Sequence, residues 1–524
     1  MAFGNCRSLK RAHIPATVTT IAGNPFMGCI GVESFDLDRD NAFYTMDENG
    51  VLYDKGMFTL LYYPASLTAE TFEIPSSVQE IAIGAFSGAQ LKHLVVPNQI
   101  TEIPDYAFQY SDLETVTFHK AITSIGAHAF DGCANLNDVT IYNNIKNLGD
   151  YAFANCTSLS NFVFEDVPEG QEGYHIGTHF FDGCTSITQI IVPNEIVFAG
   201  AESGTNCMPD YMFANTGIVN AVIPARITDL TTEGVFFNCK QLVSVDFEAK
   251  WLSGYNIGEL FFYGCSSLKS IEIPCGLGDP FTIGSHSVEG LESSGNYIFG
   301  ECTSLERVVV YIDYDFLSTG FFTFYNCTSL TSIEVIKVGD VIVDEYGDIV
   351  EYTDLTERCF GFVNVGAFQG CISLKDVKMY HGSFAIYGNA FAGSGFETLH
   401  LETLRLLEGY DHYGFDDKIF SGMPCLKSIF IGKIFTNTNI FAISQNVFSD
   451  VDTEVNVYFY LYTREEVEAF CRGDMKWMEN ASDKVTFYFK EDLPEGLEIP
   501  ESLSEIMTET PKDKDDGGGK GDER

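Results

Sequence analysis

Basic side chains are scarce in this sequence. Its 524 residues include 30 Lys+Arg against 74 Asp+Glu, which gives a formal net charge of −44. Because proteins bind nucleic acids by neutralising phosphates with Lys and Arg, this balance excludes a nucleic-acid partner. The same charge repels anionic lipid headgroups, so we expect no docking on a membrane surface. The hydrophobic fraction of 45% is nevertheless that of a folded chain rather than a disordered one.

Long apolar runs are also lacking. No stretch of about 18 apolar residues occurs, so the sequence predicts no membrane-spanning helix and no direct membrane insertion. The opening text, MAFGNCRSLKRAHIP, lacks the apolar core of a secretory signal peptide. This absence leaves a cytoplasmic location open, together with export by a route that the sequence does not display. The opening text also lies inside a motif that recurs later, which favours a fragment or a wrongly assigned start.

The fifteen cysteines do not follow the pattern of a disulfide framework. A residue at a fixed slot of every repeat is typically a small buried packing residue, and a thiol packs in this way. Ten cysteines occupy one slot of one repeated motif: Cys6, Cys29, Cys133, Cys156, Cys184, Cys239, Cys265, Cys302, Cys327 and Cys371. The cysteine count therefore indicates no redox compartment. The sequence leaves open whether the others pair: Cys207, Cys275, Cys359, Cys425 and Cys471.

The repeated motif is Phe-x-x-Cys-x-x-Leu, followed by x-x-Val-x-Ile and often by proline. AFDGCANLNDVTI, which contains Phe130, is a clear copy, and AFSGAQLKHLVVP, which contains Phe86, is a degenerate one. Phe86, Phe108, Phe130 and Phe153 lie 22, 22 and 23 residues apart, and we count about sixteen copies in all. A period of this length with a Leu-x-x-Leu-x-Leu core predicts a leucine-rich-repeat solenoid.

The end of each motif predicts a short β-strand. In the copy at Leu136, Val139 and Ile141 alternate with Thr140, so the two apolar residues point inward and Thr140 points outward. Phe and Cys then fill the other side of the core. Since one turn cannot bury its own apolar face, the turns must stack on one another. We therefore expect a mostly β solenoid with short turns, an irregular convex side and loop insertions between repeats.

Two phrases and one insertion connect the repeats to a known family. IGAHAFDGCANLNDVTI and VPNQITEIPDYAF resemble the BspA-type leucine-rich repeat. The insertion from Phe43 to Val78 is similar to a hairpin module that punctuates arrays of this family. The resemblance covers roughly residues 1–450. It implies surface proteins of anaerobic bacteria and parasitic protists, some with a proposed role in adhesion, and hence a cell-surface or secreted location.

Composition shifts divide the chain into five parts. Residues 1–29 hold partial N-terminal repeats without a cap, and residues 30–78 hold the inserted β-hairpin module, with its turn at Asn49-Gly50. Residues 79–450 form the main array, with loop insertions near 196–210, 275–298 and 336–363. Residues 451–490 predict a small α/β C-terminal cap of strand, helix and strand, whose helix starts with a capping box at Thr463 and Glu466. Residues 491–524 are acidic and Gly-rich, which is typical of a disordered tail.

The outward position of each predicted strand gives a ladder of side chains on the expected concave face. Solenoids commonly bind partners on such a face. An apolar stripe beside acidic residues indicates a protein partner, such as a host or cell-surface protein. The ladder residues that we expect to bind a partner are Thr117, Thr140, Val163, Ile191, Val222, Asp246, Glu272, Val309 and Glu334. The ladder extends at its two ends to His13 and Val95, and to Lys378, His400 and Phe430.

Other residue patterns carry no chemistry of their own. His175 and His179 have a metal-like spacing beside Cys184, but they lie at a turn between repeats and Cys184 fills the packing slot. Asp36, Asp38, Asp40 and Asp47 match a calcium loop only in part. We find no set of nucleophile, base and orienting acid. The sequence therefore predicts no enzyme, no metal site and no cofactor.

Three functions remain open. The first is an adhesin-like or scaffold module that binds proteins through the ladder and the edge loops. The second is a structural spacer or stalk, or an intracellular scaffold without a dedicated ligand. The third is a carbohydrate- or calcium-dependent ectodomain fragment. Exposed aromatics on the ladder would favour sugar binding, but Phe430 stands nearly alone there, with Tyr458 just beyond.

Overall fold

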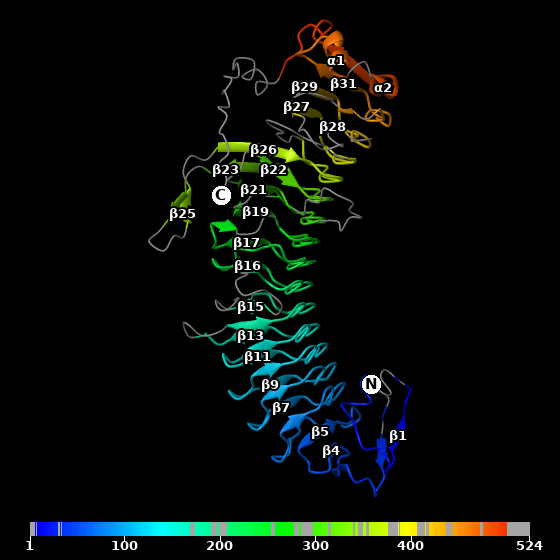
Figure 1. The fold of residues 1–524 in the computed structure, drawn as a ribbon, viewed down its shortest axis with the longest axis vertical. Coiled ribbons are helices and arrows are strands. Elements are labelled where there is room, and N and C mark those ends of the chain that lie inside the picture. Colours follow the sequence, from blue (N-terminus) through cyan, green and yellow to red (C-terminus); the bar gives the residue numbers. More distant parts are fainter. Residues whose placement is uncertain are drawn as a thin grey trace, which may run out of the picture.

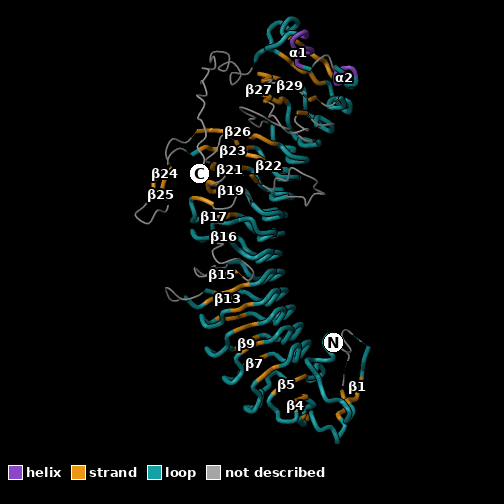
Figure 2. Tube along the Cα trace, in the orientation of Figure 1, coloured by secondary structure: helices purple, strands orange, loops and turns teal. Residues whose placement is uncertain are grey.

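The chain folds into an elongated, curved stack of short turns (Figure 1). This computed structural model describes residues 6, 8–29, 32, 34–167, 173–189, 196–198, 207–252, 257–276, 282–283, 297–312, 316–338, 341–343, 349–352, 356–375, 386, 388–405, 414–415, 419–435, 442–443, 445–471 and 475–499. Most of the described chain is turn and loop, with short strands between (Figure 2). The solenoid predicted from the repeat is confirmed.

The N-terminal half of the array contains two parallel sheets, because each turn contributes one strand to each. The first sheet is built from the Val-x-Ile end of the motif and contains β7 (His93–Val95), β9 (Thr115–Thr117), β11 (Asp138–Ile141) and β13 (Asn161–Phe164). The second contains β8 (Glu102–Ile103), β10 (Ser124–Ile125), β12 (Asn147–Leu148), β14 (Tyr174–Ile176) and β15 (Ile196–Phe198). Neighbouring strands pair without offset from turn to turn, as in Thr140 opposite Val163.

The parallel stack continues toward the C-terminus. A two-stranded sheet contains β16 (Asn220–Ile223) and β17 (Ser244–Phe247). A seven-stranded sheet contains β18 (Trp251–Leu252), β19 (Ser270–Gly276), β21 (Arg307–Ile312), β23 (Ser332–Lys337), β26 (Thr356–Phe362), β22 (Phe316–Thr319) and β20 (Thr282–Ile283). The last sheet contains β27 (Thr398–Arg405), β29 (Ser428–Phe435), β31 (Val455–Phe459) and β32 (Val485–Phe489), beside a small pair of β28 (Gly414–Phe415) and β30 (Ala442–Ile443).

The insertion near 336–363 contains strands rather than loops alone. β24 (Val341–Val343) and β25 (Ile349–Tyr352) form an antiparallel hairpin that projects from the stack in Figure 1. β26 then returns to pair antiparallel with β23 and parallel with β22. Most residues of the other two predicted insertions lie outside the described ranges.

The N-terminal strands are arranged differently from the regular turns that follow them. β1 (Arg11–Ile14) pairs with β2 (Ser34–Leu37), and β3 (Tyr44–Met46), β4 (Leu52–Asp54) and β5 (Thr59–Tyr62) form an antiparallel meander that joins the array through β6 (Glu80–Ile81). The turn between β3 and β4 contains Asn49-Gly50, with Gly50 at a φ of 81°. Ile14, Phe26 and Cys29 pack in their own cluster with Tyr62, apart from the main core.

The stack contains about 13 turns, fewer than the sixteen or so copies counted in the sequence. The N-terminal copies account for part of the difference. Their apolar residues fill the separate cluster around Phe26 instead of adding to the column of turns. A motif copy is therefore not always a turn of the solenoid.

The main core is a column of motif phenylalanines. Phe86, Phe108, Phe130 and Phe153 are fully buried, and their ring centroids follow one another at 5.1, 5.1 and 5.0 Å in near-parallel stacks. The column continues toward the C-terminus, where the ring centroids of Phe262 and Phe299 lie 5.4 Å apart. Each turn thus buries its ring between those of its two neighbours, as nearest-neighbour stacking requires.

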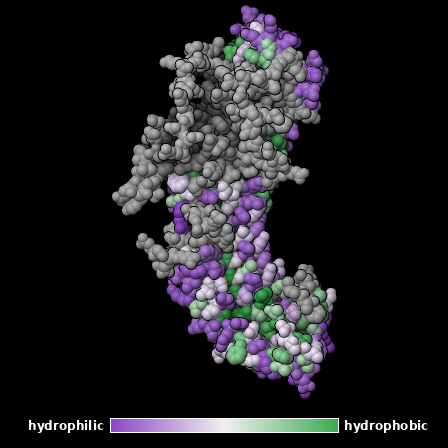
Figure 3. All heavy atoms as spheres, viewed as in Figure 1, coloured by the Kyte–Doolittle hydropathy of each residue, from purple (hydrophilic) through white to green (hydrophobic). Residues whose placement is uncertain are grey.

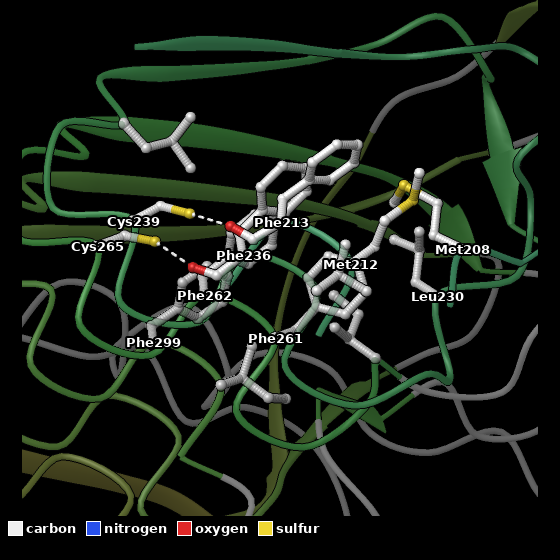
Figure 4. Close-up of a cluster of buried hydrophobic side chains, with 14 of the residues drawn as sticks. Met208, Met212, Phe213, Leu230, Phe236, Cys239, Phe261, Phe262, Cys265 and Phe299 are labelled. Carbon is white, nitrogen blue, oxygen red and sulfur yellow. Dashed lines mark hydrogen bonds between the residues drawn. The ribbon is translucent and has the colours of Figure 1, made fainter. Parts of the chain in front are cut away.

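Eight of the ten motif cysteines, from Cys133 to Cys371, add a hydrogen bond between turns. The thiol of Cys239 donates to the carbonyl O of Phe213 at 2.9 Å, and that of Cys265 donates to Phe236 at 3.2 Å (Figure 4). The same bond recurs from Cys133, Cys156, Cys184, Cys302, Cys327 and Cys371. The slot therefore gives a buried carbonyl a second donor, from the next turn, as well as filling space, which the sequence analysis did not foresee.

The C-terminal cap differs from the prediction in one respect. One helix was expected between the strands, but the structure has two, α1 (Arg464–Phe470) and α2 (Lys476–Glu479). The predicted capping box between Thr463 and Glu466 is present. α1 ends at Phe470, and the backbone N–H of the following Cys471 donates to the carbonyl O of Val467. The two helices found in the described part of the chain are far too short and polar to cross a membrane.

The start of the predicted disordered tail is ordered. Leu493, Leu497 and Ile499 pack against Phe430 and Tyr458 on the last sheet, because these aliphatic side chains have an apolar surface to cover. Residues 500–524 lie outside the described ranges.

Candidate functional site

The ladder residues share one face of the parallel sheets, which we call the ladder face. Val95 lies opposite Thr117, Thr140 opposite Val163, and Val222 opposite Asp246. Their sequence neighbours Val116, Val139 and Val245 point into the core. Glu272 lies opposite Val309, which in turn lies opposite Glu334. Ile191 and Lys378 lie outside the described residues.

The N-terminal half of the ladder face carries exposed apolar side chains. Val95 is 68% exposed, Val163 44% and Val222 49%. Thr117 is exposed and Thr140 half-buried, so the valines are separated by small hydroxyl side chains. Figure 3 shows the outer surface of this part of the molecule as a mixture of hydrophobic and hydrophilic groups. Isolated exposed valines are ordinary, but their recurrence at one rung position makes a face that a partner could cover.

A polar row runs beside the ladder, two residues earlier in each strand. The ring Nδ1 of His93 lies 2.9 Å from Thr115 Oγ1, Asn161 Nδ2 donates to Asp138 Oδ2 at 3.1 Å, and Ser244 Oγ donates to Asn220 Oδ1 at 2.8 Å. Each pair joins two adjacent turns. These bonds hold the strands in register and give the apolar rungs a polar margin.

The middle of the ladder is acidic, and one arginine bridges two of its carboxylates. Arg307 binds Glu334 through two hydrogen bonds, Nε to Oε1 at 2.8 Å and a second from the guanidinium to Oε2 at 3.1 Å, and it reaches Glu272 Oε1 at 3.2 Å. These hydrogen bonds from Arg307 lower the pKa of the Glu334 carboxyl. All three side chains are about half exposed, so the cluster stabilises the fold only modestly.

Val309 was expected on the exposed surface, and that expectation is wrong. Its register position is as predicted, but the side chain is fully buried. Arg307 precedes it by two residues on the same face and bridges Glu272 and Glu334, the two residues that flank Val309. A partner would therefore meet the ion cluster here rather than the valine. Asp246 remains exposed.

The C-terminal end of the ladder is aromatic. His400, Phe430, Tyr458 and Tyr488 lie opposite one another on β27, β29, β31 and β32. The Phe430 and Tyr458 rings stack at 4.8 Å, and the Tyr458 and Tyr488 rings at 5.2 Å. We call these four residues and Tyr460 the aromatic cradle. The expectation that Phe430 stands nearly alone, with Tyr458 just beyond, is therefore wrong, because His400, Tyr488 and Tyr460 lie beside them.

The aromatic cradle does not have the geometry of a sugar platform. A sugar stacks on an open ring face, but the faces of Tyr458 are occupied by its neighbours Phe430 and Tyr488. Phe430 is only 5% exposed, and Leu493, Leu497 and Ile499 cover the cluster. The cradle accepts aliphatic side chains in this structure.

A second column of rings lies on the turns, away from the ladder face. Tyr106, His128, Tyr151, His179 and Tyr211 stack with centroid distances of 4.9, 4.7, 4.3 and 4.6 Å and interplanar angles of 5–9°. All five have a positive φ. The sequence analysis missed this column, although an aromatic ring two residues before the motif phenylalanine recurs in DYAF, AHAF and THFF.

The candidate ion-binding residues serve structural roles. His179 Nδ1 lies 2.9 Å from Asp182 Oδ2, while Cys184 donates to a backbone carbonyl. Asp36 lies 3.0 Å from His13 across the β1–β2 pair. Asp47 accepts the backbone N–H groups of Asn49 and Val51 and so closes the hairpin turn. Over the described residues, no group of three or more His, Cys, Asp or Glu side chains is placed to hold a metal ion.

Burial makes the motif thiols poor acids. It raises the pKa of Cys133 to about 12 and that of Cys239 to about 11. No disulfide links the cysteines whose side chains the structure describes, which include Cys207, Cys275, Cys425 and Cys471. The side chain of Cys359 lies outside the described part.

Stacked turns and parallel sheets define this chain as a solenoid repeat protein. The sequence profile of the BspA type leucine rich repeat region matches residues 1–49, 61–173, 167–279, 256–344 and 359–461, in 6 copies. The chain belongs to the BspA-type leucine-rich repeat proteins, as the motif resemblance predicted. No curated protein matches the sequence.

Several solved structures are similar in fold. A leucine-rich repeat protein from Bacteroides ovatus is 19% identical, with 85% of this chain and 90% of the other covered at a TM-score of 0.45. A leucine rich cell surface protein from Faecalibacterium prausnitzii is 23% identical over 64% and 81%, at a TM-score of 0.36. The pneumococcal vaccine antigen PcpA is 15% identical over 85% and 96%, at 0.42.

Proposed function

We propose that this protein is a non-catalytic, adhesin-like module that binds another protein through its ladder face. The proposal rests on three exposed valines, Val95, Val163 and Val222, which recur at the same strand position. They lie beside a hydrogen-bonded polar row. Apolar contacts with a polar margin are the usual composition of a protein interface. The surface location of the similar Faecalibacterium protein supports a host or cell-surface protein as the partner.

The N-terminal ladder residues and the acidic middle would contact the partner together. Thr117, Thr140, Val163, Ile191 and Val222 supply the less polar part, and Asp246, Glu272 and Glu334 supply negative charge. A net charge of −44 favours a partner with a basic surface. The competing function is a spacer whose array only sets length, and it needs no accessible ladder. A carbohydrate-binding role has less support, since the aromatic rings of the ladder stack on each other.

The test is capture of extracellular-matrix or host-surface proteins by the full chain and by a Val163→Lys/Val222→Lys double variant. Lysine at these positions should abolish capture without unfolding the chain, because both side chains already face water. Ile372→Lys is the matched control, since Ile372 is exposed on a turn and is not a ladder residue. Capture lost only in the double variant supports the proposal. Equal capture by all three chains, or none by any, favours the spacer.

A further inference from the structure

The aromatic cradle is a separate apolar cluster outside the main core. Phe430, Tyr458 and Tyr460 point to the ladder face, whereas their neighbours Ile429 and Val457 point into the column of turns. Such a patch on a sheet face must be covered by something, because several stacked rings would otherwise be exposed to water. In this structure the cover comes from the chain itself, through Leu493, Leu497 and Ile499. We call residues 491–499 the strap.

The strap is held by side chains rather than by strand pairing. It leaves β32 in a tight turn, where Asp492 N donates to the carbonyl O of Phe489 at 2.9 Å. Leu497 N donates to Pro494 O at 3.2 Å, and Gly496 supplies the positive φ, 81°, that this second turn needs. This turn brings Leu493 and Leu497 to the same apolar surface. No strand lies within residues 491–499, so the strap adds no rung to the sheet.

The cap keeps its own core without the strap. Trp477 packs among Phe448, Phe459 and Phe487 in the main cluster, and Phe459 stacks on Phe489 at 5.4 Å. None of the three aliphatic strap residues belongs to that cluster. Opening the strap would therefore uncover the cradle and leave the packing beneath the last sheet intact.

We propose that the strap is an exchangeable ligand of the aromatic cradle. The cradle is a binding site for a short peptide with three aliphatic residues spaced as in Leu-x-x-x-Leu-x-Ile, and the strap occupies it in cis. A peptide of the same chemistry binds in trans when the strap is displaced. The tether holds the strap at a high effective concentration, so the free site is closed to weak competitors. This inference does not depend on the proposed function of the N-terminal ladder.

The experiment uses the full chain and a labelled synthetic peptide of residues 490–500, KEDLPEGLEIP. In the strap variant, Leu493→Ser, Leu497→Ser and Ile499→Ser are combined. Fluorescence anisotropy should show the peptide binding at least tenfold more tightly to the strap variant than to the unchanged chain. A peptide with serine at the same three positions should not bind. Adding Tyr458→Ser to the strap variant should abolish binding, whereas adding Ile372→Ser should not.

Two results would overturn the proposal. One is a strap variant that keeps its thermal unfolding transition but does not bind the peptide. The other is equal binding to the unchanged chain and the variant. Hydrogen exchange on the unchanged chain covers the case of a variant that does not fold. Amides of residues 493–499 should exchange at least tenfold faster than those of β31 and β32, because the strap opens alone. Equal protection would make the strap an integral part of the cap.

Discussion

At the scale of a single residue, the Sγ atom of the motif cysteine adds a hydrogen bond that the packing role alone does not require. The sequence pattern predicted a small packing residue at this slot. That is confirmed for nine of the ten motif cysteines, which are buried, and is wrong for Cys6, which is exposed. The thiol hydrogen bond to the preceding turn could not be predicted, because it depends on how closely the turns stack. Where the slot holds threonine, Thr216 Oγ1 donates within its own turn, to Phe213 O at 2.7 Å. A donor is thus retained there.

Removing the donor should cost more than a small cavity would. In Cys265→Ala, the carbonyl of Phe236 loses one of its two donors inside a fully buried column and keeps the backbone N–H of Cys239. We expect the lost hydrogen bond to lower the free energy of unfolding by about 0.5–1.5 kcal/mol, in addition to the loss from the smaller side chain. Cys265→Ser keeps a donor and should lose less. Urea denaturation of the two variants measures the difference, and an equal loss would show that only volume matters.

Alkaline pH should destabilise the fold through the same thiols. The buried cysteines have a raised pKa in the folded state, about 12 for Cys133 and about 11 for Cys239, because burial disfavours the thiolate. Their contribution to stability is fully present below the pKa of an unfolded thiol, about 8.5. It is lost as the pH rises from there toward the folded value, since only the unfolded chain releases the proton. The urea concentration at the midpoint of unfolding should therefore be lower at pH 10 than at pH 8.

Thiol labelling provides an independent check of this burial. At neutral pH, a thiol reagent should modify the exposed Cys6 and Cys425 rapidly. The fully buried Cys133 and Cys239 should react only after denaturation. Rapid native labelling of either buried thiol, mapped by mass spectrometry, would contradict the packing described above.

At the scale of the element, the predicted strands and their register were largely correct. The alternation of inward and outward residues is local, so Val139 and Thr140 could be assigned to opposite faces from the sequence. Exposure of an outward residue is not local. Val309 is buried beside the Arg307 ion cluster, and Phe430 is buried by a strap more than sixty residues further along the chain. Neither the burial of Val309 nor that of Phe430 can be predicted from the period of the motif.

The ring column on the turns supports an element-scale prediction. His128 stacks between Tyr106 and Tyr151 at a left-handed backbone position. His128→Ala removes both ring contacts and keeps the backbone strain, so we expect a loss of about 1–3 kcal/mol, from two aromatic pairs of about 0.5–1.5 kcal/mol each. His128→Gly also removes the contacts but relieves the strain by about 1 kcal/mol. It should therefore be the milder change in thermal unfolding.

At the scale of the whole molecule, stability should be distributed turn by turn. Each turn contacts only its neighbours, so the array resembles a one-dimensional chain of coupled units. Phe153→Ala leaves a cavity in the middle of the phenylalanine column and should cost about 3–5 kcal/mol. The loss should appear as faster hydrogen exchange around β11, β12 and β13. Protection at the C-terminal cap should not change.

The matched control for this prediction is Ile372→Ala, which removes an exposed aliphatic side chain. A surface change of this kind typically alters stability by no more than about 0.5 kcal/mol. If Phe153→Ala instead lowered protection uniformly from β7 to β32, the whole array would unfold as one unit.

Where neighbouring strands pair without offset, the rungs of the ladder face have a fixed spacing. They repeat every ~4.8 Å, whereas alternate side chains of an extended peptide repeat every ~6.7 Å. A peptide lying along the array falls out of step after one or two rungs and returns to register only after about seven. Contacts with such a partner are therefore confined to separate sites along the molecule. The valines, the arginine cluster and the aromatic rings are three such sites. The residues of each can be substituted without disturbing the other two.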